Sequence, residues 1–163
     1  MIFGNNISLM VMIKDLSKIE SNDPCFSFNH DSTVSEIADL MDLKDIGAVP
    51  VLDSDNVLIG ILSERDIVRK LVKTGRDSDL VTANDIMTKE IKSIYMDTTV
   101  VEAQKIMTEN NIRHLPVVDE NKKLINFLSQ RDLIINPAKK KKQLMIISFF
   151  LLIFITVFII LII

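Results

Sequence analysis

The chain of 163 residues contains few of the residue types that build several common kinds of functional site. Its one cysteine, Cys25, cannot form an intrachain disulfide, and we interpret it as a structural thiol. The two histidines, His30 and His114, lack the clustering typical of zinc ligands. Four glycines form no glycine-rich phosphate loop, and no Ser/His/Asp or Cys/His arrangement is recognisable. We therefore expect neither a catalytic site nor a metal site.

Charged residues are absent from the last 21 positions, residues 143–163. As a helix, this segment is long enough to cross a hydrocarbon core of roughly 30 Å. A buried core helix is the alternative, but it would normally carry a polar stripe, and Ser148 and Thr156 are too sparse to form one. The sequence therefore predicts a C-terminal transmembrane helix that acts as a tail anchor.

Four lysines, residues 139–142, stand directly before this segment. A solvated linker or a nucleic-acid tract would also be basic. Lysines that flank a span, however, mark its cytoplasmic side and attract anionic lipid headgroups by roughly 1 kcal/mol each. The remainder of the chain is acidic, because 22 Asp and Glu outnumber 19 Lys and Arg even with those four included. We expect a single-pass membrane protein with its folded part in the cytoplasm, membrane lipid as a partner and no nucleic acid.

The chain contains an internal repeat. Residues 31–68 align without a gap with residues 97–134 after a shift of 66 positions, and 15 of the first 36 pairs are identical. Two copies of one small unit normally pack on each other about a pseudo-twofold axis. The cleft between the copies is therefore where we expect a functional site.

Each copy shows the same order of patterns, which predicts a β-α-β-β-α unit and an α+β fold. The spacings Thr33-x-x-Glu36 and Thr99-x-x-Glu102 are typical of capping boxes that begin a helix. The expected strands are residues 25–28, 48–52 and 57–62 in the first copy and 91–95, 114–118 and 123–128 in the second; second helices open at Ser63 and Ser129. The predicted organisation is an N-terminal extension (1–12), a first repeat (13–72), a linker (73–84), a second repeat (85–136), a basic linker (137–142) and the transmembrane helix (143–163).

The two copies resemble a tandem pair of CBS (cystathionine β-synthase) domains, called a Bateman module. The matching motifs are Ile46-Gly-Ala-Val-Pro-Val51, Gly60-Ile-Leu-Ser-Glu-Arg-Asp66, Asp85-Ile-Met-Thr88, Ile112-Arg-His-Leu-Pro-Val117 and Leu128-Ser-Gln-Arg-Asp132. The resemblance covers about residues 13–135 and is closest to small stand-alone bacterial CBS-pair proteins. The hydrophobic tail is not part of that pattern.

The resemblance implies a non-catalytic regulatory module with no required cofactor, which binds AMP, ADP, ATP, S-adenosylmethionine or, less often, a dinucleotide of the NAD type. In such families the aspartate of the Ser/Thr-x-x-Asp motif holds the ribose hydroxyls, and backbone near the proline strand lines the adenine pocket. The implied ligand-binding residues are Ser63, Arg65, Asp66, Ala48, Val49 and Pro50 in one site, and Ser129, Arg131, Asp132, His114, Leu115 and Pro116 in the other.

The chemistry of the motif fits this implication but leaves an alternative open. A carboxylate can accept hydrogen bonds from both vicinal hydroxyls, and a helix N-terminus can receive a phosphate, to which Arg113 could add charge. Ser-x-x-Asp also fits a capping box, so Asp66 and Asp132 could be helix caps alone. We expect the second site to be the weaker one, because Asn126 replaces Gly60 at a point where backbone would approach the ligand.

Together these features favour a membrane-tethered sensor of adenosine-containing ligands. We expect a homodimer that acts on a neighbouring transporter, channel or enzyme. The alternative is a ligand-free dimerisation or interaction module at the membrane.

Overall fold

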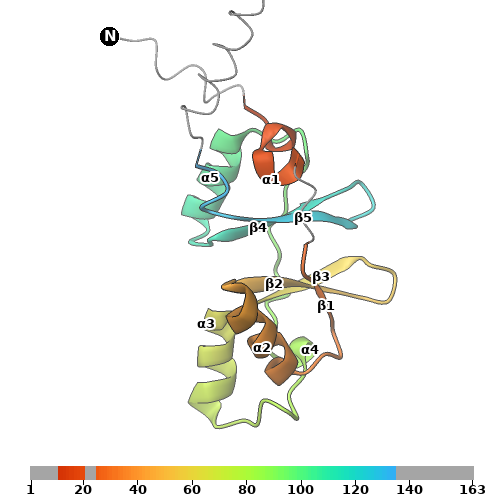
Figure 1. The fold of residues 1–163 in the computed structure, drawn as a ribbon, viewed down its shortest axis with the longest axis vertical. Helices are drawn as coiled ribbons and strands as arrows, with labels where there is room; N and C mark the ends of the chain where they lie inside the picture. Colours follow the sequence, from red (N-terminus) through yellow and green to blue (C-terminus); the bar gives the residue numbers. More distant parts are fainter. Residues whose placement is uncertain (1–10, 21–24, 135–163) are drawn as a thin grey trace, which may run out of the picture. The chain divides into compact units, whose positions relative to one another are not determined.

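The computed structural model describes residues 11–20 and 25–134, and these form two halves of the same architecture (Figure 1). In the first half, β1 pairs in parallel with β2, and β2 pairs antiparallel with β3. Its elements are β1 (Phe28–Asn29), α2 (Val34–Lys44), β2 (Ala48–Leu52), β3 (Leu58–Ser63), and a helical run made of α3 (Glu64–Asp66), η3 (Ile67–Leu71) and η4 (Val72–Thr74).

The second half repeats this arrangement. Helix α5 (Val100–Glu109) precedes an antiparallel pair, β4 (His114–Val118) and β5 (Leu124–Ser129). A parallel bridge from Ile94 to Val117 takes the place of β1, since Phe28 pairs with Val51 at the equivalent positions. The two sheets face each other, with helices on their outer sides (Figure 1). The repeat predicted from the sequence is therefore confirmed as a structural repeat.

The strand bounds follow the predicted pattern with small shifts. Strands β2 and β4 have the expected bounds, whereas β3 and β5 start and end one residue later. They extend to Ser63 and Ser129 because these serines still pair with Ala48 and His114. The first strand of each copy is shorter than expected: only Phe28–Asn29 and a bridge at Ile94 remain. After Ser129 the chain turns through Leu133, and the rest of the predicted second helix lies outside the described residues.

The helices begin and end where the sequence supplies suitable caps. The Glu36 amide donates to the Thr33 hydroxyl at 3.3 Å, and the Thr33 amide donates to the Glu36 carboxylate at 3.0 Å. This confirms the predicted capping box of α2. At α5 the Glu102 amide donates to the Thr99 hydroxyl at 3.1 Å. Both helices are followed by a residue in the left-handed region, Asp45 (φ 52°) after α2 and Asn111 (φ 51°) after α5, a conformation that Asp and Asn tolerate well.

The segments that lead into the two repeats, residues 11–18 and 81–88, are exchanged between the halves; we call them the leading segments. The first contains η2 (Ile13–Asp15) and the start of α1 (Ser17–Glu20), and the second contains α4 (Ala83–Ile86). The Val100 amide donates to the Val11 carbonyl at 2.9 Å, and the Val34 amide donates to the Val81 carbonyl at 2.9 Å. The first leading segment thus packs on the second half and the second on the first half. Because Val11 is buried, the predicted extension 1–12 includes residues of the fold.

Gly60 is needed for packing against a leading segment. A Cβ atom at this position would lie 2.2 Å from Sδ of Met87, a buried residue of the second leading segment. Overpacking of this kind typically costs about 1–3 kcal/mol. We expect Gly60→Ala to lower the free energy of unfolding by that amount in urea titrations. Gly47→Ala is the matched control, because its Cβ would meet the end of the exposed Glu64 side chain at 3.1 Å and His114 Cε1 at an ordinary 3.9 Å. A loss as large as that of Gly60→Ala would contradict this explanation.

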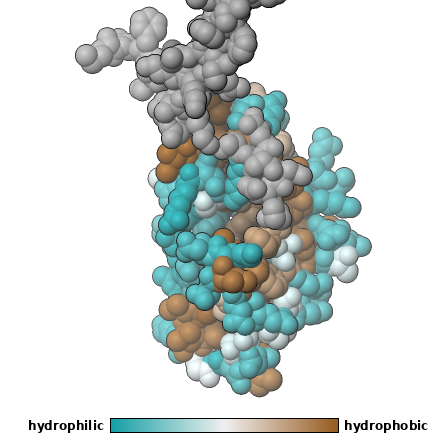
Figure 2. All heavy atoms as spheres, viewed as in Figure 1, coloured by the Kyte–Doolittle hydropathy of each residue, from teal (hydrophilic) through white to brown (hydrophobic). Residues whose placement is uncertain are grey.

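The described surface carries apolar side chains in small patches within a mostly hydrophilic face (Figure 2). The most exposed large apolar residues include Leu43, Val68, Val72 and Leu80. Within residues 11–20 and 25–134, no helix combines the length and the apolar character needed to cross a bilayer. The predicted transmembrane helix, residues 143–163, lies outside the described residues.

Candidate functional site

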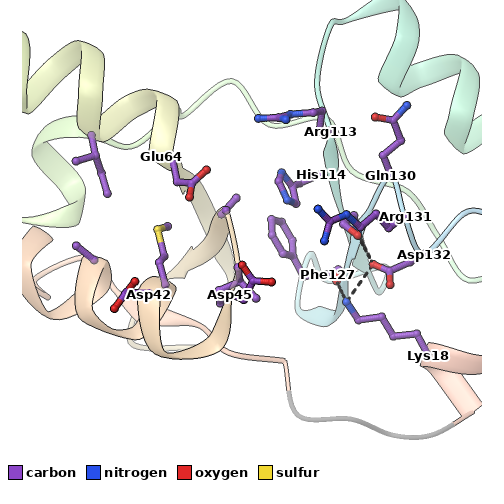
Figure 3. A pocket seen from close by; sticks show the side chains of 17 residues that line it. Lys18, Asp42, Asp45, Glu64, Arg113, His114, Phe127, Gln130, Arg131 and Asp132 are labelled. Carbon is purple, nitrogen blue, oxygen red and sulfur yellow. Dashed lines mark hydrogen bonds and ion pairs between the residues drawn. The ribbon is translucent and has the colours of Figure 1, made fainter.

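A cavity of about 810 Å³ lies between the two halves (Figure 3). The first half lines it with the end of α2, the loop to β2, the start of β2 and α3. The second half contributes the start of β4, the end of β5 and the turn that follows, and α1 adds Lys18. The volume lies within the range of about 300–1,000 Å³ that is usual for small-molecule sites.

Asp132 lines this cavity, and only one of its two carboxylate oxygens accepts hydrogen bonds from the described residues. Its Oδ2 accepts from the Ser129 amide (2.6 Å), the Ser129 hydroxyl (2.7 Å) and the Lys18 ammonium (3.2 Å). Among the described residues no donor bonds Oδ1. Burial alone would raise the pKa of Asp132, but the Ser129 hydrogen bonds and the Lys18 charge outweigh it and lower that pKa. Asp132 is therefore an ionised acceptor fixed in orientation, with a free oxygen.

Asp66, the equivalent residue of the first half, has both oxygens occupied and does not line the cavity. Its Oδ2 accepts from the Ser63 amide (3.0 Å) and hydroxyl (2.6 Å). Its Oδ1 accepts from the Thr88 hydroxyl (3.0 Å) and pairs with the Lys70 ammonium (2.8 Å). Burial opposes ionisation of Asp66, but Lys70, Ser63 and Thr88 together lower its pKa. Asp66 acts as a helix cap and an ion-pair partner.

These two geometries differ from what the expected ranking of the sites would suggest. The sequence prediction made Asp66 the stronger ribose acceptor and the Asp132 site the weaker one, whereas the cavity lies at Asp132. The Met87 side chain fills the space beside Gly60, where the prediction placed the approach of the ligand. Asn126 is buried, its side-chain oxygen Oδ1 accepts from the Phe127 amide at 2.7 Å, and it does not line the cavity.

The other predicted residues divide into those that line the cavity and those that do not. Ala48, His114, Ser129 and Arg131 line it, as does Arg113. The strand residues Val49, Pro50, Leu115 and Pro116 are buried and are not in the lining. Arg65 lies outside as well, where its guanidinium donates to the Asn111 carbonyl at 3.5 Å.

The His114 ring packs on an aromatic neighbour. It stacks on Phe127 with ring centroids 5.5 Å apart and an interplanar angle of 4°, and both rings line the cavity. Burial, assisted by the Arg113 charge, lowers the pKa of His114 to about 4. The imidazole is therefore uncharged at neutral pH. His114 therefore adds no positive charge to the cavity at neutral pH.

The lowered pKa of His114 predicts a defined pH dependence of stability. The unfolded chain binds a proton near the ordinary histidine pKa of 6.5, while the folded chain binds it only near pH 4. The His114 contribution is thus complete above about pH 6.5 and declines as the pH falls toward 4. Urea unfolding across this range should show a steeper decline for the wild type than for His114→Gln. Parallel curves would contradict the assignment.

Several lining residues have no counterpart in the prediction: Lys18, Asp42, Asp45, Glu64 and Phe127. The place of Lys18 in the site follows from the fold. The backbone pairings that place Val11 at Val100 and Val81 at Val34 align residues 12–18 with residues 82–88, so Lys18 occupies the position of Thr88. Both side chains donate to the aspartate of the half on which they pack. Asp42 and Asp45 belong to no recognised motif, and Glu64 lies within the motif Gly60-Ile-Leu-Ser-Glu-Arg-Asp66 but has no assigned role there.

Two β-α-β-β halves that enclose a ligand-sized cavity define a module of two paired repeats. The sequence profile of the CBS domain matches residues 13–73 and 83–138, and the chain belongs to the CBS domain family. Modules of this kind are typically regulatory, and some bind adenosine-containing ligands. Within the part of the chain that the structure describes, no group of three or more His, Cys, Asp or Glu side chains is arranged to hold a metal ion.

The chain is also similar to individual proteins. An uncharacterized protein of Methanopyrus kandleri is 40% identical over 102 residues, which are 63% of this chain and 52% of that protein. The match thus spans about half of that relative's length. A CBS-domain-containing protein of Agrobacterium tumefaciens has a similar structure (TM-score 0.68, 30% identity, covering 77% of this chain and 92% of that one). So does the CBS domain pair of protein MJ0100, solved with 5′-methylthioadenosine and S-adenosyl-L-methionine (TM-score 0.64, 25% identity, 76% and 96%).

Proposed function

We propose that this chain is a regulatory module that binds one adenosine-containing ligand in the cavity at Asp132. The open Oδ1 oxygen of Asp132 is the observation that carries the proposal. An ionised carboxylate oxygen has two lone pairs, so Oδ1 can accept from both hydroxyls of a ribose while Oδ2 stays bonded to Ser129 and Lys18. The acceptor is in place before the ligand arrives.

The rest of the cavity suits a nucleoside. Phe127 and His114 supply aromatic surface, and Met41, Ile46 and Ile67 supply apolar surface on the opposite side. Aromatic and apolar side chains are the usual neighbours of a purine ring. The relative solved with two adenosyl compounds adds support, since its CBS pair has the same fold.

The regulatory step follows from the fact that both halves line the cavity. A ligand that contacts both halves binds best at one relative orientation of them, and it shifts the population toward that orientation only by its differential affinity. The altered orientation is then available to a partner, which we take to be a transporter, channel or enzyme at the membrane.

The module works as a homodimer. Exposed Val68 and Val72, four residues apart on one helical run, offer apolar surface for pairing.

The membrane tether is the second part of the proposal. It rests on the charge-free segment 143–163 and the four lysines before it. We expect the full chain to stay in the membrane pellet after extraction with alkaline carbonate, and a variant lacking residues 143–163 to be found in the supernatant. Full-length protein in the supernatant would remove the tether and leave the ligand site untouched.

Calorimetry of the full chain in mild detergent tests the ligand function. AMP, ATP, S-adenosylmethionine and NADH are titrated separately, and at least one should bind with a stoichiometry of one per chain. A flat result for all four, on protein that unfolds cooperatively, would favour the alternative of a ligand-free interaction module.

A further inference from the structure

The cavity has two walls of opposite charge. On the first-half wall, Asp42, Asp45 and Glu64 are the charged residues, and among the described lining residues this wall has no Lys or Arg (Figure 3). The wall formed by the second half and α1 carries Lys18, Arg113 and Arg131 together with Asp132. A ligand that spans the cavity therefore meets carboxylates on one side and guanidinium groups on the other.

The negative charges of the three acidic side chains on the first-half wall are not balanced by a partner among the described residues. Within residues 11–20 and 25–134, none of their carboxylates forms an ion pair or a side-chain hydrogen bond. On the other wall, Lys18 is bonded to Asp132 and to the Phe127 carbonyl (2.9 Å), so its charge is balanced in place. Arg113 and Arg131 remain opposite Asp42, Asp45 and Glu64, which leaves the cavity with an excess of negative charge.

This balance is unfavourable for a polyphosphate. ATP carries several negative charges, and only the two arginines could neutralise them, because His114 is uncharged at neutral pH. A ligand with both a cationic and an anionic group satisfies both walls: its carboxylate can pair with the arginines and its cationic centre can lie against the acids.

From this arrangement we infer that the cavity selects an adenosyl ligand whose 5′ substituent carries a positively charged centre, in preference to adenosine polyphosphates. The inference rests on the proposed function, since it takes the ribose to be held at Asp132. The three acids act as specificity-determining residues, while Asp132 supplies affinity common to all adenosyl ligands.

The test compares ligands of different charge on the full chain in detergent. S-adenosylmethionine, S-adenosylhomocysteine, and ATP with and without Mg²⁺ are titrated by calorimetry. S-adenosylmethionine should bind tightest and ATP at least about tenfold more weakly, the sum of three partly screened charge contacts. S-adenosylhomocysteine, which lacks the sulfonium charge, should lie between them.

The same titrations on variants separate charge selection from binding itself. The triple variant Asp42→Asn, Asp45→Asn, Glu64→Gln should lose most of the preference for S-adenosylmethionine over ATP. Asp39→Asn is the matched control, because Asp39 lies on the same helix, is exposed and does not line the cavity. An unchanged preference in the triple variant, or ATP or its Mg²⁺ complex binding as tightly as S-adenosylmethionine to the wild type, would overturn the inference and leave the proposed function standing. If no adenosyl compound binds, the proposed function fails as well.

Discussion

Asp132→Asn should weaken adenosyl-ligand binding by about 100-fold, whereas Asp66→Asn should change it by less than about threefold. The asparagine keeps the shape of the side chain but removes the charge and one acceptor oxygen. Hydrogen bonds to a charged group contribute about 1.5–3 kcal/mol each, and losing two of them at the lower end of that range, about 3 kcal/mol, corresponds to roughly this change in affinity. Calorimetry of both variants against the tightest wild-type ligand measures the difference.

Asp66→Asn should instead lower stability. Asp66 is buried, and its carboxylate accepts from Ser63 and Thr88 and pairs with Lys70. Removing the charge breaks the ion pair and disturbs this hydrogen-bond network, at a cost of about 2 kcal/mol. Urea unfolding of both variants provides the control. If Asp66→Asn abolished binding while its unfolding curve matched the wild type, the site would have to be reassigned to the first half.

Ile13→Ala should lower the free energy of unfolding by about 3 kcal/mol, within the range of 2–5 kcal/mol usual for truncation of a large buried aliphatic side chain. Ile13 has no exposed surface, although it belongs to the short helical turn η2 of the first leading segment. Its amide also donates to the Thr98 carbonyl at 2.9 Å, which fixes the segment to the second half. Urea denaturation monitored by circular dichroism measures the loss.

Leu43→Ala is the control for this prediction. Leu43 is 75% exposed on α2, so the same kind of truncation should change stability by less than about 0.5 kcal/mol. Equal losses for Ile13→Ala and Leu43→Ala would mean that the first leading segment is not part of the folded core.

Much of the fold could be predicted because the repeat supplies each observation twice. The capping spacing at Thr33 recurs at Thr99, and the strand with Pro50 recurs with Pro116. A pattern that arose by chance in one copy would not be expected to recur in the other. The exchange of the leading segments could not be predicted in this way. It depends on contacts such as Val11 to Val100, which are far apart in sequence and leave no local pattern.

The sequence did not show which of the two Ser-x-x-Asp motifs faces the cavity. Both copies carry Ser-x-x-Asp, and the motif alone does not show which aspartate keeps an open oxygen. A comparison of the next turn would have helped: Lys70, which pairs with Asp66, corresponds to Asn136 in the second copy. The acidic wall was missed because Asp42, Asp45 and Glu64 are ordinary exposed residues until the fold brings them opposite Arg113 and Arg131.

The crossing of the leading segments also determines the smallest piece of this chain that can exist as a folded body. A fragment containing only the first repeat would keep residues 11–18, which pack on the second half. It would lack residues 81–88, which pack on the first half. A protease that cuts the exposed loop around Gly75 would leave two peptides still joined through residues 11–18 and 81–88, and the nicked product should migrate as a single species until denaturant separates it. The smallest part of this chain that can fold independently is consequently the pair of repeats.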